Sequence, residues 1–383
     1  MGGLGTRSTR ALVDTDWLLG IVPALLAGIG ILTMHTFGEG VSVAPRQLIW
    51  LGIAVAVFIA LAFSDLRFIR RTPVIIAGYG LVLFLLVLLL IAAPTIQGAK
   101  AWFALGPISF QPADAAKVVI IALCAKYFSR RHIEIRNIRH IITSAVYVGI
   151  PFLLILVQPD LGTAAIIGIL WFGLMLVSGV SKKHIAIVLA LGAVVAGLFW
   201  TFGLHDYQRT RIVSFLNPAA DPYGAGYNAY QAVIATGSGE LFGKGIGYGT
   251  QSKLRFLPEY QTDFIFAAFA EEWGFVGVAL ILLLYALLFM RLVAIARYAA
   301  TNFDAFFTLG VMILLLAHMF LHVGINMGVL PVTGTTIPFM SAGGSHLLME
   351  FVLLGIVASL ARHGREVPRG ALAKEYHGYG SEA

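Results

Sequence analysis

The stretch PVIIAGYGLVLFLLVLLLIAA, residues 73–93, decides the fold class of this chain. It contains no charged side chain, and about 20 apolar residues are enough to cross a bilayer as a helix. Nine further apolar stretches resemble it, at residues 17–33, 47–63, 113–127, 141–157, 164–178, 185–203, 264–292, 306–327 and 347–360. Those at 113–127 and 164–178 are short for a span. The sequence therefore predicts an all-α, polytopic integral membrane helix bundle with about ten transmembrane helices.

The composition excludes an ordinary soluble domain. Hydrophobic residues make up 59% of the 383 residues and charged residues 12%, and the mean hydropathy is +0.87. Soluble domains carry about twice that share of charge. We expect residues 1–361 to form one transmembrane domain with a large outer loop at 204–263, and the Gly-rich tail at 362–383 to be disordered. The single cysteine, Cys124, lies in an apolar stretch and excludes an internal disulfide.

The positive charge of the chain follows its membrane topology. The formal net charge is +7, and most of the 26 Lys and Arg residues fall in connections that share one side of the membrane. Placing that side in the cytoplasm follows the positive-inside rule, with both termini inside and the long loop outside. The basic residues left on the outer side are Arg46, Lys100, Lys117, Arg209, Arg211, Lys244, Lys253 and Arg255. We interpret the charge as a topology signal of a cytoplasmic-membrane protein and not as a nucleic-acid-binding surface.

The connection after the seventh apolar stretch is the only long polar run. It begins RIVSFLNPAADPYGAGYNAYQAVIATGSGELFGKGIGYGTQ at Arg211 and ends KLRFLPEYQTDFIFAAFAEEWGF at Phe275. Long connections without regular structure are usually functional. Asp263 stands where the eighth span begins, and the basic side chains of the same loop could hold a diphosphate while this carboxylate acts as a base. The glycines of GSGELFGKGIGYG would let the backbone approach an anion, although the residue order is not that of a P-loop. A purely structural loop is the alternative.

Polar residues at membrane depth are further candidates, because unpaired charges there cost at least about 3 kcal/mol each. Asp114 and Lys117 lie three residues apart on one helical face, either as an interfacial salt bridge or as a pair that contacts substrate. Asp160, in QPDLGT, either caps the next helix or faces an outer cavity.

His318, His322 and Asn326 recur every four residues along one helical face. Two histidines at that spacing can bind a metal. No carboxylate shares their spacing, so polar packing between helices is favoured, and His346 with Glu350 is interpreted as a structural pair. The later loop PVTGTTIPFMSAGGS, residues 331–345, either walls the same cavity as the long loop or only connects two helices. Glu271 and Glu272 point to different sides of a regular helix, so they and Asp263 are not expected to share one pocket.

Several long motifs in order carry a family resemblance. They are Arg46-Gln47, GAKAWFALGPISFQPADAAK at 98–117, QPDLGT at 158–163, RIVSFLNPAADPYGAGYN, GSGELFGKGIGYGTQSKLRFLPEYQTDFIFAAFAEEWGFVG and GVLPVTGTTIPFMSAGGSHL. On these, the chain resembles the SEDS family (shape, elongation, division and sporulation) of integral membrane peptidoglycan glycosyltransferases over roughly residues 16–360. GYN, GTQ and FLPE favour its RodA-like branch.

The resemblance implies an inverting polymerisation of lipid II on the outer face of the membrane, in cell elongation and shape maintenance. The 4-hydroxyl of one disaccharide would attack the anomeric carbon of another and expel undecaprenyl diphosphate, leaving a β-1,4 link. Asp263 matches the essential acid of the family and would deprotonate the hydroxyl. For the diphosphate we expect Arg211 first, then Arg46, Lys100 and Lys117, while Asp160 and Asp114 match further important positions. A class B penicillin-binding protein would be the partner, and a divalent cation (Mg or Mn) with unassigned ligands could assist.

The chain departs from the family pattern at several positions. Asp114 stands where Glu is usual, Gln261 where His is usual, and Ala342 and His346 alter the usual SYGGSS loop, which puts a proton relay at Gln261 in doubt. Two other functions stay open at this point. Ten spans with buried charges also suit a lipid II flippase, and a non-catalytic scaffold for a penicillin-binding protein would have the same membrane pattern.

Overall fold

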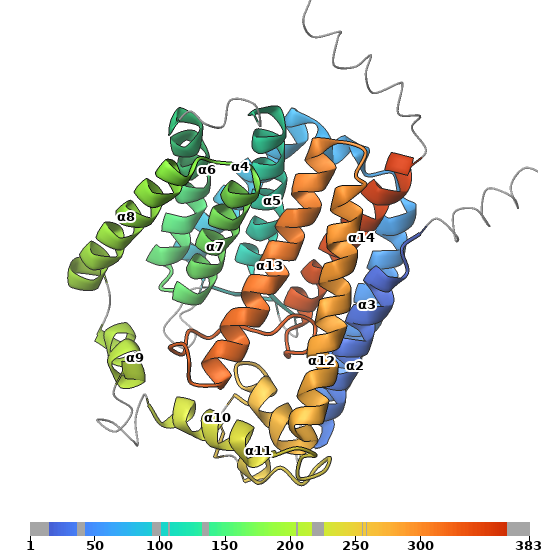
Figure 1. Cartoon of the computed structure of the whole chain (residues 1–383), viewed down its shortest axis with the longest axis vertical. Coiled ribbons are helices and arrows are strands. Elements are labelled where there is room, and N and C mark those ends of the chain that lie inside the picture. Colours follow the sequence, from blue (N-terminus) through green and yellow to red (C-terminus); the bar gives the residue numbers. More distant parts are fainter. Residues whose placement is uncertain are drawn as a thin grey trace, which may run out of the picture.

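The computed structural model describes residues 15–36, 43–93, 101–105, 108–131, 138–203, 206–216, 226–254, 256–257 and 259–365. Helices make up nearly all of it, which confirms the predicted all-α membrane bundle (Figure 1). In chain order the elements are α2 (Leu18–Thr36), α3 (Val43–Phe63), η1 (Arg67–Arg70), α4 (Thr72–Ala92), β1 (Phe103–Leu105), β2 (Ile108–Phe110), α5 (Pro112–Arg131), α6 (Ile138–Val157), α7 (Leu161–Val177), α8 (Lys182–Leu198), η2 (Phe199–Gly203), α9 (Asp206–Leu216), α10 (Tyr227–Ser238), α11 (Thr250–Lys253), α12 (Ile265–Arg297), α13 (Asn302–Asn326) and α14 (Gly344–Arg365).

Each of the predicted apolar stretches coincides with a helix, but not all of these helices have the length and composition of a membrane span. Within the described residues, eight do: α2, α3, α4, α6, α8 continued by η2, α12, α13 and α14. The two others are α5 and α7, which the sequence had already marked as short. α7 has 17 residues, or about 26 Å of helix, which is less than the roughly 30 Å hydrocarbon core. α5 has 20 residues but carries Asp114, Lys117 and a basic C-terminal end.

The interior of the bundle is built by α3, α5, α13 and α14. α14 lies along α3, where Phe58 and Phe351 meet edge to face at 6.3 Å, and it is the most buried of the membrane helices. α13 packs against α5, α7 and α12. A side chain at Gly310 of α13 would touch Ile121 of α5 at 2.9 Å and Leu174 of α7 at 3.5 Å. Small residues allow such close helix approach in membranes.

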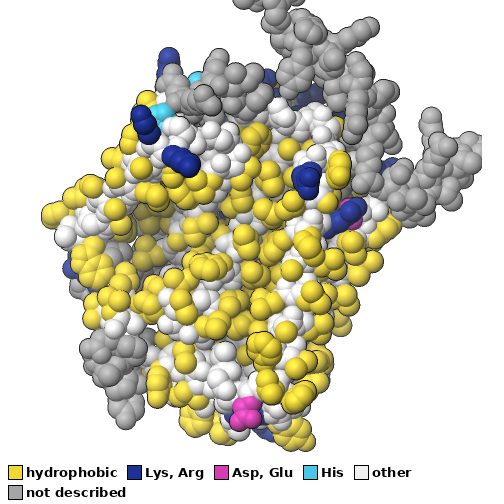
Figure 2. Space-filling model, viewed as in Figure 1, with side chains coloured by type: hydrophobic (Ala, Val, Ile, Leu, Met, Phe, Trp, Pro, Cys, Tyr) yellow, Lys and Arg dark blue, Asp and Glu magenta, His cyan; other side chains and the backbone are white. Residues whose placement is uncertain are grey.

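The periphery of the molecule is apolar. No side chain of α8 is buried, and this helix stands at the edge of the bundle in Figure 1. Figure 2 shows apolar side chains over most of the visible face, with Lys and Arg side chains gathered toward its upper end. A wide apolar belt bounded by charge is the surface expected of a protein in a bilayer.

α12 is broken by Gly274. This residue has φ 63° and ψ −165°, which is not helical, and it divides the 33 residues into a short segment before Gly274 and a longer segment after it. The break frees main-chain groups, and the chain preceding the helix satisfies them. The N–H of Phe275 donates to the C=O of Glu240 at 2.8 Å, and that of Val276 donates to Leu241 at 3.1 Å. Gly274 lacks room for a side chain, since a Cβ there would collide with the main chain of Gly243.

Two connections between the apolar helices contain regular structure that the sequence did not predict. The long loop at 204–263 contains α9, α10 and α11, and the sequence analysis assigned no helices to it. A short hairpin, β1–β2, precedes α5, with Phe103 opposite Phe110. Its strands have three residues each, too few to give a recognisable alternation of apolar and polar side chains. At the other end, α14 continues to Arg365, four residues past the predicted end of the transmembrane domain at 361.

Candidate active site

Asp263 lies in the turn that precedes α12, and its main chain is held on both sides. Its N–H donates to the C=O of Glu259 at 3.1 Å, and its C=O accepts from the Nδ2 of Asn326 at 3.0 Å. The Oδ1 of Asn326 also accepts from the N–H of Ala267 at 3.1 Å, which satisfies a free donor in the first turn of α12. Asn326 therefore fixes the helix start that carries Asp263, while the Asp263 side chain is half-buried.

The histidines of α13 anchor the loop at 331–345. The Nδ1 of His322 lies 2.8 Å from the C=O of Thr335, and the Nδ1 of His318 lies 3.2 Å from that of Thr336. A carbonyl can only accept, so each Nδ1 carries the proton. Of the two interpretations of this face, polar packing between elements is the one that the geometry supports. Within the described ranges, no three His, Cys, Asp or Glu side chains cluster as a metal site.

The loop at 331–345 lies directly against Asp263. The Oγ of Ser341 donates to the C=O of Thr262 at 2.9 Å, and the N–H of Ala342 donates to the C=O of Gln261 at 2.8 Å. A side chain at Gly334 would lie 3.7 Å from the Oδ2 of Asp263. The loop therefore approaches the carboxylate itself, as expected of a wall and not of a mere connector.

The surroundings of Asp263 favour its protonated form. Burial, together with the negative charge of Glu259, raises the pKa of Asp263 to about 6, although the positive charge of Arg211 acts in the opposite direction. A carboxylate with a pKa near the working pH is suited to accept a proton. Arg211 is an exposed residue of α9, near the beginning of the long loop.

Asp160 caps α7 and also reaches α5. Its Oδ1 accepts from the N–H of Thr163 at 2.9 Å, and its Oδ2 accepts from the Nε2 of Gln111 at 3.3 Å. A side chain at Gly162 would collide with the C=O of Thr333 at 2.6 Å, so the start of α7 packs against the loop that touches Asp263. Capping is therefore confirmed for Asp160, which lies across this loop from Asp263.

Asp114 and Lys117 form a buried ion pair in the bundle. The Nζ of Lys117 lies 2.8 Å from the Oδ1 of Asp114 and 3.2 Å from the Nε2 of His318. His346 of α14 bridges two carboxylates, with its Nδ1 3.1 Å from Asp114 and its Nε2 3.1 Å from Glu350. The predicted pairing of His346 with Glu350 is confirmed, and the predicted salt bridge belongs to a network that joins α5, α13 and α14. Both members of the ion pair are almost fully buried, so their contacts hold α5, α13 and α14 together inside the bundle.

The remaining predicted cations are dispersed. Arg46 is exposed at the start of α3, beside a separate hollow next to the N-terminus of α14. Lys100 lies outside the described residues. Lys244, one of the loop cations, is held by Glu271 at 2.7 Å.

The glycine-rich segment packs on α12, and the anions that its main chain meets are the carboxylates of Glu271 and Glu272. Its main-chain N–H groups at Lys244 and Gly245 donate to the C=O groups of Glu271 and Glu272, at 3.0 and 3.1 Å. The carboxylate of Glu271 also accepts from the N–H of Thr250 at 2.9 Å. The N–H of Gly247 donates to the carboxylate of Glu272, so the segment does let the main chain approach an anion, although this anion belongs to the protein itself. Contact of these glycines with a diphosphate stays a prediction. The lack of a side chain at Gly243 also lets the loop reach the broken helix. Both glutamates serve the loop, and neither joins Asp263.

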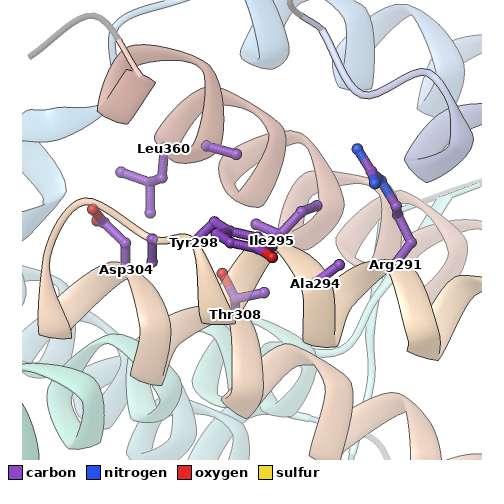
Figure 3. A pocket seen from close by; sticks show the side chains of 9 residues that line it. Arg291, Ala294, Ile295, Tyr298, Asp304, Thr308 and Leu360 are labelled. Atoms are coloured by element: carbon purple, nitrogen blue, oxygen red, sulfur yellow. The ribbon is translucent and has the colours of Figure 1, made fainter.

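A second hollow lies at the opposite end of the bundle (Figure 3). It measures about 80 Å³ and is lined by α12, α13 and α14, including Arg291 and Asp304. Asp304 pairs with Arg70 at 2.8 Å, and Arg291 with Asp16 at 2.6 Å. Asp304 precedes Asn326 by 22 positions on α13, or about 33 Å along the helix. This hollow is therefore separate from the Asp263 site.

Comparison with known proteins decides the family. A family model described as Cell cycle protein, which covers FtsW, RodA and SpoVE, matches residues 10–366. The chain belongs to this family. Its member MrdB of Escherichia coli K12, a peptidoglycan glycosyltransferase, is 35% identical, covering 92% of this chain and 94% of MrdB. Stage V sporulation protein E of Bacillus subtilis 168 is 33% identical, covering 93% and 100%.

Solved structures of the FtsW/RodA/SpoVE family share the fold. Thermus thermophilus rod shape determining protein RodA is 30% identical, with a TM-score of 0.69 over 91% of this chain and 97% of that one. A chain from a study of how a peptidoglycan synthase complex coordinates polymerization and crosslinking is 31% identical, with a TM-score of 0.79 over 92% and 99%. The predicted SEDS membership is confirmed.

Two contacts in this family member escaped sequence analysis. The i, i+4 pattern of α13 identified a polar face, but it did not reveal that Asn326 holds the Asp263 turn. His346 was assigned to Glu350, whereas its contact with Asp114 crosses 232 positions of sequence. Gln261 donates to the hydroxyl of its neighbour Tyr260 at 2.9 Å, a contact that requires no proton relay.

Proposed function

We propose that this protein is a peptidoglycan glycosyltransferase that polymerises lipid II on the outer face of the cytoplasmic membrane, with Asp263 as the general base. The observation that carries the proposal is a half-buried carboxylate with a pKa of about 6, mounted on a helix start that Asn326 fixes. The names of the relatives, peptidoglycan glycosyltransferases of the MrdB and FtsW types, supply the reaction class.

The proposed reaction transfers one proton and one glycosyl group. Asp263 accepts the proton of the acceptor 4-hydroxyl, and that oxygen forms a bond to the anomeric carbon of the donor. The bond between this carbon and the diphosphate oxygen breaks with inversion, and undecaprenyl diphosphate leaves with the bonding electrons. A base contributes about 100- to 10,000-fold to such a step. Arg211 is the residue whose positive charge lowers the pKa of Asp263. We therefore assign it to stabilise the negative charge that develops on the diphosphate.

Other parts of the site position these groups. The loop at 331–345 and the start of α7 form the wall beside Asp263, and Asp160 stabilises that wall through its cap. The network around Asp114 and Lys117 holds α5 against α13 and α14. The donor groups of the described residues do not form a protein-held metal site, so no step is assigned to a divalent cation.

A class B penicillin-binding protein is proposed as the partner that crosslinks the new strand. The similarity to a chain from a peptidoglycan synthase complex that couples polymerization to crosslinking supports this assignment. α8, which buries no side chain in the bundle, is the membrane helix with the most surface left for lipid or for such a partner. Both termini are assigned to the cytoplasm, as the basic inner connections require.

Purified protein, its penicillin-binding partner and labelled lipid II test the proposal directly. Wild type should form glycan strands, and Asp263→Asn should lower the rate about 100- to 10,000-fold. Asp65→Asn is the matched control, because Asp65 is an exposed aspartate that pairs with Arg67 outside the site. Equal polymer from wild type and Asp263→Asn would reject the base. Translocated lipid II without polymer in a vesicle assay would instead favour a flippase, and complex assembly without polymer would favour a scaffold.

A further inference from the structure

The loop at 331–345 contains a tight turn with a strained residue at its centre. Phe339 has φ 65°, in the left-handed region, where a bulky side chain is a rare outlier. The turn is narrow around it, since the N–H of Met340 donates to the C=O of Pro338 at 2.8 Å. Such a main-chain conformation is unfavourable by itself and persists only where the surroundings hold it. The contacts that hold Phe339 are therefore of interest.

A buried carboxylate of α14 meets the main chain of Phe339. The Oε2 of Glu350 accepts from the N–H of Phe339 at 2.8 Å, and both residues are almost fully buried. A hydrogen bond to an ionised acceptor is stronger than one between neutral groups. The ring of Phe339 also packs edge to face on Phe351, with 5.7 Å between the ring centroids. The main chain and the side chain of Phe339 are thus both fixed from α14.

Side chains from two other helices hold the residues before Phe339. The hydroxyl of the buried Tyr285, on α12, donates to the C=O of Pro338. The Nδ1 of His318, on α13, lies 3.2 Å from the C=O of Thr336. Among the described residues, the side chain that meets the N–H of Phe339 is that of Glu350. The strained residue itself therefore depends on the glutamate.

His346 holds Glu350 from one turn earlier on α14. Its Nε2 lies 3.1 Å from the Oε1 of Glu350, the oxygen that does not meet Phe339. These two atoms make no aligned hydrogen bond, so the attraction of charges accounts for the contact. The Nδ1 of His346 faces Asp114 at 3.1 Å, and ionised carboxylates only accept, so both ring nitrogens carry protons. With Lys117 on Asp114, the four buried charges balance.

The other end of the turn reaches the candidate base. The Oγ of Ser341 accepts from the N–H of Ile337 at 3.0 Å and donates to the C=O of Thr262 at 2.9 Å. One hydroxyl thereby closes the turn and joins it to the residue that precedes Asp263. Because Ser341 is two positions after Phe339, a change of conformation at Phe339 displaces the hydroxyl that contacts Thr262.

Stability of the bundle is a weak reason for a buried ion pair on α14. Replacing such a pair by apolar side chains of similar volume is often neutral or stabilising, because desolvation of the charges offsets their attraction. α14 already has an extensive apolar contact with α3, including Phe58 on Phe351. What Glu350 adds is a hydrogen-bond acceptor at a fixed place, opposite a main-chain donor of the strained turn.

We propose that Glu350, oriented by His346, is a positioning residue that holds the strained turn at Phe339 and thereby the direction of the Asp263 carboxylate. This inference rests on the proposed function, in which Asp263 is the general base. Glu350 is 3% exposed, so it acts through the turn and not on the substrate. A displacement of about 1 Å in a reacting group can lower a rate about 100-fold.

The test separates the acceptor of Glu350 from its charge. Glu350→Gln keeps an oxygen for the N–H of Phe339 and removes the charge, whereas Glu350→Met, of similar size, removes both. Polymerisation of lipid II by the full-length protein with its penicillin-binding partner gives kcat and KM, and hydrogen exchange of residues 331–345 reports the turn. Glu350→Met should lower kcat about 10- to 100-fold, change KM less than about twofold and speed exchange. Glu350→Gln should stay within about threefold of wild type. Glu240→Met, the same change at an exposed glutamate, should alter neither measurement.

A second pair of variants decides the question if an unpaired His346 prevents folding. His346→Met combined with Glu350→Gln or with Glu350→Met removes the charged pair in both chains, which then differ in the acceptor alone. The Gln chain should again have the higher kcat and the slower exchange. Equal kcat in the Gln and Met members of either pair, or a change in KM alone, would overturn the proposal. If wild type makes no glycan while exchange follows the expected order, the proposed polymerase function fails and the role of Glu350 in holding the turn stands.

Discussion

The side chain of Asn326 bonds to the main chain of Asp263 at 3.0 Å, although 63 positions of sequence separate them. The same amide accepts from the N–H of Ala267 at 3.1 Å and donates to the C=O of His322 at 2.8 Å. One buried amide thereby ties the end of α13 to the start of α12. The Asn326 contact acts together with the bond from the N–H of Asp263 to the C=O of Glu259, so it helps to set the direction in which the Asp263 carboxylate points.

Replacing Asn326 by Ala should lower activity and stability together. It leaves a buried main-chain oxygen and a buried N–H without partners, which costs about 1–3 kcal/mol for each group left unsatisfied. Thermal unfolding in detergent and glycan polymerisation measure the two effects. Asn302→Ala, at the exposed beginning of the same helix, is the matched control and should change neither. An Asn326→Ala protein with full polymerisation would show that the Asp263 turn needs no anchor.

The acid limb of the pH–rate profile should report Asp263. The base works only when ionised, and its pKa is raised to about 6, so the rate should fall as pH drops through 6 and not through the ordinary value near 4. Glu259→Gln removes the neighbouring negative charge and should move this limb to lower pH. Arg211→Gln removes the opposing positive charge and should move it to higher pH. Shifts in the same direction, or no shift in either variant, would contradict the assignment.

Gly274→Ala should destabilise the fold. Alanine at φ 63° is strained by about 1–3 kcal/mol, and its Cβ would collide with the main chain of Gly243. The loop that holds Glu271 would then separate from α12. Gly80→Ala is the control, since no atom lies within 4 Å of a Cβ built there in the middle of α4. Thermal unfolding should show a lower midpoint for Gly274→Ala alone, and equal midpoints would show that the break tolerates a side chain.

The buried ion pair should behave cooperatively in a double-mutant cycle. Lys117→Met leaves Asp114 charged and buried, which costs about 3–5 kcal/mol. Asp114→Asn in the same chain removes the orphaned charge, so the double variant should be more stable than Lys117→Met alone. The comparison of unfolding midpoints measures the coupling. Additive losses would mean that His318 and His346 support these groups separately.

Cysteine accessibility should define the orientation. Cys124 is the single cysteine of the chain, and it is buried. Cys124→Ala therefore gives a background without thiols, into which single cysteines can be introduced. Tyr248→Cys in the long loop should react with a membrane-impermeant maleimide in intact cells, and Tyr298→Cys at the end of α12 only after permeabilisation. Both tyrosines are largely exposed, so access depends on the side of the membrane. The reverse pattern would place Asp263 on the cytoplasmic side and contradict the proposed function.

The accuracy of the sequence-based prediction differs between helices and contacts. Apolar length is a local property, so the stretch at 73–93 predicted α4 within about one residue at each end. α5 is harder to assign: the sequence marked 113–127 as a short span, and Asp114 and Lys117 make its start polar. Their mutual pairing compensates the cost of burying the two charges. The sequence did not predict the packing of the glycine-rich loop, since only its contact with Gly274 shows why a small residue is needed at Gly243.

By itself, the sequence determined the membrane class, the positions of the apolar helices and the family. It also marked the one long polar connection, which leads to Asp263. Hydrophobic length and motif order are properties of neighbouring residues, so they can be read without the fold. Only the tertiary structure decided that Asn326 holds the Asp263 turn, that His346 joins Asp114 to Glu350, and that Gln47 joins the beginning of α3 to the residues just before α14. These partners are 63 to 296 positions apart, except for His346 and Glu350. A buried polar group must find a partner, but which one it meets is set by how the helices pack.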